Sequence, residues 1–175
     1  MNIEDLKNTL PETAKDIQLN LSTVLSQEGA PDLTIKQIAG IALAVSYTTR
    51  NKTLIQAILD ASKPYLNEAE IQAAQSSAAI MGMNNIYYRF IHLVGDSTFS
   101  SIPAKLRMNV MSNPGIDKVS FELNSLAVSA INGCGMCMEA HTKTLLKHDV
   151  SPLAIQSSIR IAAVLNAVSV SLEMV

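Results

Sequence analysis

The sequence contains two cysteines, Cys134 and Cys137, separated by Gly135 and Met136. They lie at the start of a predicted helix, where a spacing of three residues puts both sulfurs on one face within one turn. One turn brings the two Cα atoms within the roughly 4.4–6.8 Å that a disulfide requires. Backbone N–H groups and the helix dipole at that end stabilise a thiolate, the nucleophilic form. The pair therefore predicts thiol–disulfide redox chemistry.

Two further residues could move protons near the cysteines. His141 follows Cys137 by four residues and Cys134 by seven, so all three share one face of a continuous helix. Histidine exchanges protons near neutral pH. Glu122 lies on the preceding predicted helix and faces the thiols if the two helices form a hairpin. We expect Glu122 and His141 to supply a proton path.

Two other interpretations of the cysteines stay open on the sequence alone. A structural zinc site needs four ligands, and the candidates are the two cysteines, His141 and either Glu122 or Glu139. The sequence has no second C-x-x-C and no H-x-x-x-H, so we predict no metal site. Two buried cysteines could also pack as small hydrophobic side chains, although Gly133 and Gly135 leave room for a partner to approach.

The remaining histidines and the methionines carry weaker signals. His92 and His148 have no companions of catalytic type, so we expect them to be structural or solvent-exposed. A group of four methionines is interpreted as adaptable core filler: Met81, Met83, Met108 and Met111.

Composition limits the class of protein. The 175 residues are 48% hydrophobic, which suits one folded domain, 1–175. The net charge is −2 and no basic run exceeds two residues, so no nucleic acid partner is expected. No signal sequence and no apolar run near the ~20 residues of a membrane span are visible. We expect a cytoplasmic protein, in which a cysteine pair is more often catalytic or metal-binding than structural.

Hydrophobic periodicity predicts an all-α, compact fold. Thr34, Asn67 and Ser151 are expected helix caps, and the segment 95–103 is polar and turn-rich. The predicted helices cover residues 3–10, 11–25, 35–49, 52–62, 68–93, 105–111, 118–131, 136–148 and 152–173.

A weak internal repeat suggests a duplication. Leu-Ala-Val-Ser occurs at residues 43–46 and again at 126–129, an offset of 83. The repeat halves would be about 35–95 and 118–175. At the same offset Cys134 corresponds to Asn51 and Glu122 to Ala39, so the active site would lie only in the C-terminal half.

The region around the cysteines resembles the alkyl hydroperoxide reductase D (AhpD) family of the carboxymuconolactone decarboxylase-like superfamily. Segments 10–17, 78–85 and 106–115 are similar as well, so the likeness covers nearly the whole chain. The motif that carries the resemblance is Glu122 followed by Ser129-Ala130-Ile131-Asn132-Gly133-Cys134-Gly135-Met136-Cys137-Met138-Glu139-Ala140-His141.

The resemblance implies an all-helical homotrimer that acts in peroxide defence. By this likeness the chain is an antioxidant thiol–disulfide oxidoreductase with alkyl hydroperoxide reductase (peroxidase) activity. It would regenerate a partner peroxiredoxin of the AhpC type. Electrons would come from the dihydrolipoyl groups of a lipoylated dehydrogenase-complex acyltransferase, with dihydrolipoamide as donor and no cofactor bound to the chain.

The resemblance also implies residue roles. Cys137 would form the sulfenic acid intermediate and the mixed disulfide with the partner, and Cys134 would donate a proton and resolve that disulfide. Glu122 and His141 would form the proton relay. The family commonly has a histidine where this chain has Met136, and a thioether cannot shuttle protons. We therefore expect disulfide exchange to survive and direct peroxide turnover to be low.

Two alternative functions remain. Related members of the superfamily suggest a carboxymuconolactone decarboxylase-like lactone enzyme, although that chemistry does not need two adjacent thiols. The other alternative is a non-enzymatic helical protein that oligomerises or binds a metal.

Overall fold

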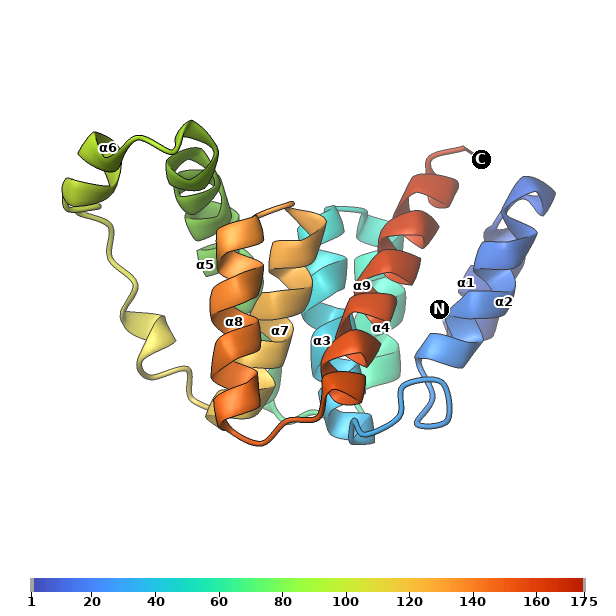
Figure 1. Ribbon diagram of the computed structural model, residues 1–175. Helices are drawn as coiled ribbons and strands as arrows, with labels where there is room; N and C mark the ends of the chain where they lie inside the picture. The colour runs from blue at the N-terminus through green and yellow to red at the C-terminus, as the bar shows by residue number, and fades with distance from the viewer. Residues whose placement is uncertain (1, 175) are drawn as a thin grey trace.

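Helices make up most of the computed structural model, which describes residues 2–174 and places no strand among them (Figure 1). The prediction of an all-α fold is confirmed. The α-helices are α1 (Ile3–Thr9), α2 (Lys15–Val24), α3 (Ile35–Thr49), α4 (Lys52–Ser62), α5 (Glu68–Val94), α6 (Ser97–Ser101), α7 (Lys118–Ile131), α8 (Gly135–Lys147) and α9 (Pro152–Leu172), with 3₁₀ turns η1 (Glu12–Ala14) and η2 (Asn109–Met111).

Side-chain caps set the starts of the long helices. Thr34 and Asn67 open α3 and α5 with capping boxes, in which Gln37 and Glu70 reach back to the cap backbone. Ser151 accepts a hydrogen bond from the backbone of Ala154 at the start of α9. These three caps confirm the prediction, and the bounds of α3, α4 and α7 match it.

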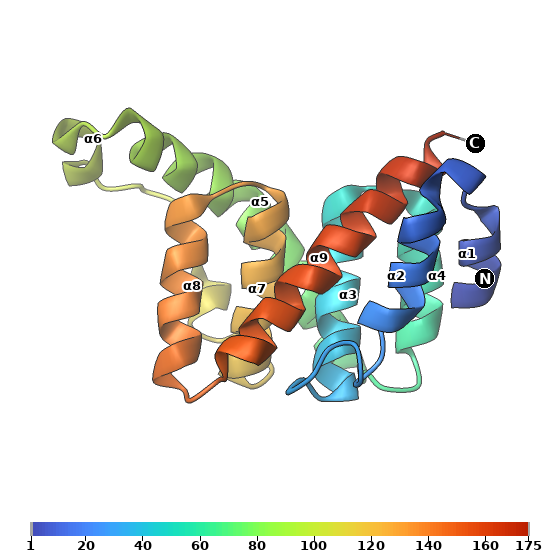
Figure 2. The same ribbon diagram turned by 45° about the vertical axis from the view of Figure 1, so that its right-hand side comes forward.

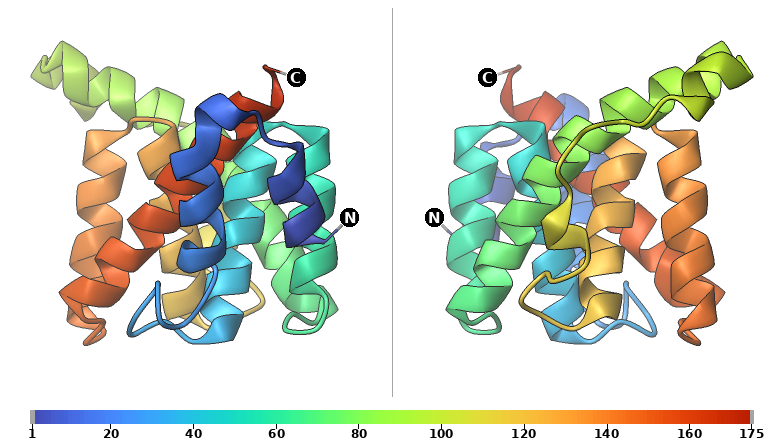
Figure 3. Two further views of the ribbon diagram at one scale, coloured as in Figure 1. Left: turned by 90° about the vertical axis from the view of Figure 1, so that its right-hand side faces the viewer. Right: turned by 90° about the vertical axis from the view of Figure 1, so that its left-hand side faces the viewer.

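The core lies around α3 and α7, which pack against each other. Helices α5 and α9 both contact this pair, and they cross it diagonally on opposite faces (Figures 2 and 3). Helix α4 packs on α3, and α8 packs on α7. The nine buried residues of α7, 121–129, include both apolar side chains and Glu122. Helix α7 is therefore the central element on which the site is built.

The two predicted repeat halves correspond closely in local geometry. Arg50 and Gly133 both have left-handed backbones, with φ of 63° and 68°, and they lie 83 residues apart. Each precedes a helix-capping residue, Asn51 at α4 and Cys134 at α8. Both halves have the order medium, short and long helix. A common origin of the halves and the single domain 1–175 stay predictions.

Helix α9 is, within residues 2–174, the one helix long and apolar enough to cross a membrane. It packs against α2, α3 and α7, and it buries Ile161, Leu165 and Val168 against them. A core helix passes the same test of length and hydropathy, so this feature is weak evidence for a membrane span.

The connection between α5 and α7 differs from the prediction. The predicted helix over 105–111 is wrong: only η2 forms there, because Lys105 adopts a left-handed φ of 51° that interrupts a helix. The turn-rich segment 95–103 contains the short helix α6, capped by Asp96. The predicted helix over 11–25 is divided into η1 and α2, which meet at Ala14 and Lys15.

Candidate active site

The disulfide lies in the sharp turn from α7 to α8. Gly133 takes a left-handed backbone, which a residue without a Cβ adopts without strain. The Cys134 amide donates to the Ser129 carbonyl oxygen at 3.1 Å, so the turn folds back on the end of α7. Cys134 and Cys137 form a disulfide with their Cα atoms 5.3 Å apart. Their spacing on one turn is as predicted.

The two sulfurs differ in environment. Cys134 is fully buried and caps α8, and its Sγ accepts a hydrogen bond from the Cys137 amide at 3.3 Å. Cys137 retains 7% of its exposure and lines a surface cavity. Cys137 is therefore the cysteine that borders the cavity.

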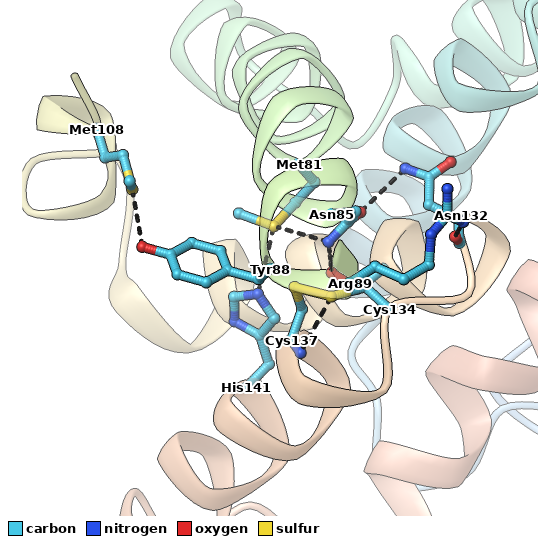
Figure 4. The surroundings of a disulfide bond; sticks show 10 residues. Met81, Asn85, Tyr88, Arg89, Met108, Asn132, Cys134, Cys137 and His141 are labelled. Carbon is cyan, nitrogen blue, oxygen red and sulfur yellow. Dashed lines mark hydrogen bonds between the residues drawn. A yellow bond between two sulfur atoms is a disulfide. The ribbon is translucent and has the colours of Figure 1, made fainter. Parts of the chain in front are cut away.

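His141 and Glu122 form a buried pair across α8 and α7. His141 Nδ1 lies 2.6 Å from Glu122 Oε2, and both residues are more than nine-tenths buried. The other ring nitrogen, Nε2, lies 3.4 Å from the Met81 sulfur on α5 (Figure 4). The hairpin of α7 and α8 is confirmed. The carboxylate contacts the histidine ring, which itself shares the cavity wall with Cys137.

A chain of polar contacts ties α5 to the turn that holds the cysteines. Asn85 Nδ2 donates to Ser129 Oγ at 2.8 Å, and Asn132 Nδ2 donates to Asn85 Oδ1 at 3.0 Å. Arg89 Nη1 donates to the Asn132 carbonyl oxygen at 2.6 Å. Asn85, Arg89 and Asn132 lie beside the disulfide in Figure 4. The sequence analysis did not single them out, although the four-residue spacing of Met81, Asn85 and Arg89 places them on one helical face.

The cavity beside Cys137 has a volume of about 280 Å³ and an almost wholly apolar lining. It lies between α5, α8 and the segment around η2. Tyr88 lines it, and its hydroxyl lies 3.9 Å from the Met108 sulfur (Figure 4). The interpretation of the methionines as core filler is confirmed for Met81, which is 1% exposed within the hydrophobic core, and Met111 packs against that core. Both also line the cavity, together with Met108 and Met136.

Of the remaining candidates, His148 lies at the opposite end of α8 from the disulfide, whereas His92 lies beside the turn: a Cβ on Gly135 would be 3.8 Å from its Nε2. His148 is exposed at the end of α8, where its Nδ1 is 2.9 Å from the Thr144 carbonyl oxygen, and His92 is exposed on α5. Glu139 is exposed, and the hydrogen bond from Lys143 lowers its carboxyl pKa below the ordinary value. No three His, Cys, Asp or Glu side chains gather to hold a metal ion anywhere in residues 2–174.

The arrangement can support two-electron thiol–disulfide exchange. One cysteine lines a cavity, and the second is fully buried and bonded to it. The buried His–Glu pair offers a group that takes and returns protons. Residues 98–174 match the Carboxymuconolactone decarboxylase family. This range contains Glu122, both cysteines and His141, and it leaves out the residues that α5 contributes to the site. The fold and the site thus define a helical protein of that class with a disulfide-bonded C-x-x-C pair.

Full-length relatives narrow the class. Alkyl hydroperoxide reductase AhpD of Coxiella burnetii (strain RSA 493 / Nine Mile phase I) is 54% identical over 167 residues, which cover 95% of this chain and 94% of the relative. The protein of the same name from Brucella anthropi is 47% identical over 173 residues, with 99% and 97% coverage. A Brucella melitensis biotype 1 relative gives the same values. The chain belongs to the AhpD family.

A pair of glycine substitutions tests the turn. Gly133→Ala places a Cβ on a left-handed backbone and should lower the free energy of unfolding by about 1–2 kcal/mol. Gly82→Ala lies in the middle of α5 with nothing within 4 Å of the new Cβ, and it should raise that free energy by about 0.5–1 kcal/mol. Urea unfolding of both variants measures the two changes. Equal effects of one sign would contradict the role of Gly133.

Proposed function

We propose that this protein is an antioxidant thiol–disulfide oxidoreductase that reduces a partner peroxiredoxin and has weak alkyl hydroperoxide reductase activity of its own. The observation that carries the proposal is the Cys134–Cys137 disulfide at the start of α8, with Cys137 on a cavity that also contains His141. The names of the relatives support the reductase activity. Lactone decarboxylation gains less support, because it has no use for a disulfide.

In the proposed reductive half-reaction, a dihydrolipoyl dithiol donates two electrons. One of its sulfurs, as thiolate, attacks Cys137 Sγ, so the Cys134–Cys137 bond breaks and Cys134 leaves as a thiolate. The second dithiol sulfur then attacks the first, which closes the cyclic lipoyl disulfide and releases Cys137. The two thiol protons pass to the two cysteines. The position of Cys137 on the cavity wall and the complete burial of Cys134 support attack at Cys137.

In the proposed oxidative half-reaction, the Cys137 thiolate attacks the disulfide of an AhpC-type peroxiredoxin. A mixed disulfide forms and one peroxiredoxin thiolate leaves. Cys134 then attacks Cys137, restores the intramolecular disulfide and releases the reduced partner. The second sulfur is already in place on the same helical turn, so this step is fast in comparison with attack by a free thiol.

Glu122 and His141 act as the proton relay in this scheme. His141 takes the proton of an incoming thiol and returns it to a leaving thiolate, while Glu122 fixes the orientation of the ring through Nδ1. The buried position of the pair keeps bulk water from competing for the proton.

An exposed apolar surface supports association with protein partners. It covers the end of α5, α6 and the segment that follows, and its residues are Ile86, Phe90, Leu93, Val94, Phe99, Ile102 and Leu106. Apolar surfaces of this kind mark protein interfaces. We further propose that the chain forms a homotrimer and is cytoplasmic. The peroxiredoxin and a lipoylated acyltransferase would both dock on it.

Trapping of the mixed disulfide tests the assignment of the two sulfurs. Cys134→Ser should accumulate a covalent complex between Cys137 and an oxidised AhpC-type peroxiredoxin, because the resolving sulfur is gone. Cys137→Ser is the matched control and should form no such complex. Non-reducing gel electrophoresis with mass spectrometry identifies the linked cysteine. A complex through Cys134 instead would reverse the roles.

Replacement of the buried carboxylate tests the relay. Glu122→Gln keeps a polar group near His141 Nδ1 but cannot carry the charge, and should slow disulfide exchange by about 10²-fold. Glu139→Gln changes an exposed carboxyl on α8 and should leave the rate unchanged. The rate is measured from pH 5 to 9 with dihydrolipoamide. A wild-type rate in Glu122→Gln contradicts the relay.

The presence of Met136 leads us to expect slow peroxide turnover and unimpaired disulfide exchange. It lines the cavity next to Cys137 but has no proton to give. With cumene hydroperoxide and no partner protein, turnover should be low relative to exchange with the peroxiredoxin, and Met136→His should raise it. Fast turnover by the unaltered chain contradicts this prediction.

A further inference from the structure

Two basic side chains of α5 lie against the turn that holds the disulfide, and the proposed mechanism uses neither charge. A Cβ on Gly133 would lie 3.9 Å from Arg89 Nη1. A Cβ on Gly135 would lie 3.8 Å from His92 Nε2. These two glycines are the neighbours of Cys134 in the chain. Because Arg89 and His92 are three residues apart, one face of α5 brings both basic groups to this turn.

The positive charge at the turn is largely uncompensated. The charged groups at this end of α5 and on the elements beside it are Arg89, Asp96, Glu139 and Lys143. Arg89 donates to the Asn132 carbonyl oxygen, which carries no net charge. The hydrogen bond from Lys143 lowers the pKa of the Glu139 carboxyl, and His92 adds a smaller contribution. Lys143 thus already balances the carboxylate that α8 presents to His92.

Two further groups near this end of α5 add little negative charge to the turn. The Asp96 carboxylate accepts a hydrogen bond from the Thr98 amide and caps α6. The last two turns of α7, residues 125–131, contain no charged side chain. Protonation of the exposed His92 ring therefore adds a positive charge beside the disulfide.

A positive charge at this place acts on the sulfur that leaves. Cys134 lies at the amino end of α8, where it accepts a hydrogen bond from the Cys137 amide and the helix dipole is positive. When a thiolate attacks Cys137, a new S–S bond forms there and the electron pair of the old bond leaves on Cys134. A nearby cation stabilises that anion, and a more stable thiolate leaves faster. Arginine is charged at every pH, whereas histidine changes its charge between pH 5 and 8.

We propose that His92 is a pH-dependent switch of the disulfide: its protonated ring stabilises the Cys134 thiolate and speeds exchange in mild acid, while Arg89 supplies a constant charge. The inference rests on the disulfide exchange of the proposed function and adds a residue outside the cavity and the Glu122–His141 pair. Attacking thiols lose their thiolate form as the pH falls. A leaving group that improves over the same range offsets part of that loss.

Titration of a single thiol tests the effect of the charge. Cys137→Ser leaves Cys134 as the only thiol of the full-length chain, and ultraviolet absorption follows its ionisation. In this background His92→Lys is charged throughout the titration and His92→Gln never is, so Cys134 should ionise at a lower pH in the lysine variant. The same two substitutions at His148, at the other end of α8, are the control and should give equal midpoints. Equal midpoints for the two His92 variants would overturn the proposal.

Rates of disulfide reduction test the switch in the chain with both cysteines. The probe is 2-mercaptoethanol, with each rate corrected for the thiolate fraction of the reagent. His92→Lys should react about two- to fivefold faster than His92→Gln, the effect of one exposed charge at a helix end. The wild type should match His92→Lys at pH 6 and His92→Gln at pH 9. Salt at about 1 M should remove most of the difference.

Two results of the rate measurement contradict the switch. In the first, the wild type and His92→Gln react alike at pH 6. In the second, His92→Gln is slower than the wild type by one factor at both pH values, which is the result expected for a change of shape. His148→Gln should match the wild type throughout, and an equal slowing by that control also overturns the assignment.

Further outcomes separate His92 from the proposed function and from a purely structural role. If dihydrolipoamide fails to reduce the wild type while the His92 variants still differ with 2-mercaptoethanol, the proposed donor is wrong and the switch stands. His92 also lies in the last turn of α5, where a cation favours the helix end. A changed melting temperature with unchanged titration and rates would assign His92 to helix stability alone and overturn the inference.

Discussion

The buried contact between Glu122 and His141 constrains the whole site. Two ionisable side chains in the interior must face each other, because loss of one partner of such a buried pair costs about 3–5 kcal/mol. The contact joins the middle of α7 to α8 and fixes the rotation of α8 about its axis. Cys137 lies one turn before His141 on the same face, so its sulfur is fixed as well. The position of the disulfide follows from the pairing of the proton groups.

Helix α5 contacts the site at two places along its length, at His141 and at the end of α7. Met81 contacts Nε2 of His141, the ring nitrogen that Glu122 does not contact. Asn85 and Arg89 follow Met81 at intervals of four residues, and both donate hydrogen bonds to the end of α7. One face of one helix therefore positions both the His141–Glu122 pair and the turn that contains Cys134. Between these residues, Asn84 and Tyr88 face the cavity. A single helix thus supplies the support of the redox pair and the wall of the space in front of it.

Local signals in the sequence predicted much of this arrangement. The caps Thr34, Asn67 and Ser151 are readable because a capping side chain acts on residues only two or three positions away. The shared face of the cysteines and His141 follows from helical spacing alone. The role of Met81 depends on contact with a residue 60 positions away, which no local pattern encodes. The left-handed backbone of Lys105, which excludes a helix through that residue, was likewise not evident from the sequence.

The two halves show how a disulfide can occupy the position of an ordinary helix cap. Asn51 caps α4 by accepting a hydrogen bond from the Leu54 amide, and Cys134 caps α8 by accepting one from Cys137. A capping residue and the third residue of its helix have the separation that a C-x-x-C disulfide requires. An anion at such a position gains from the free amides and the helix dipole. In the proposed mechanism Cys134 leaves as a thiolate into this position, and a stabilised thiolate is the better leaving group. In that mechanism the cap thus favours attack at Cys137, the cysteine that lines the cavity.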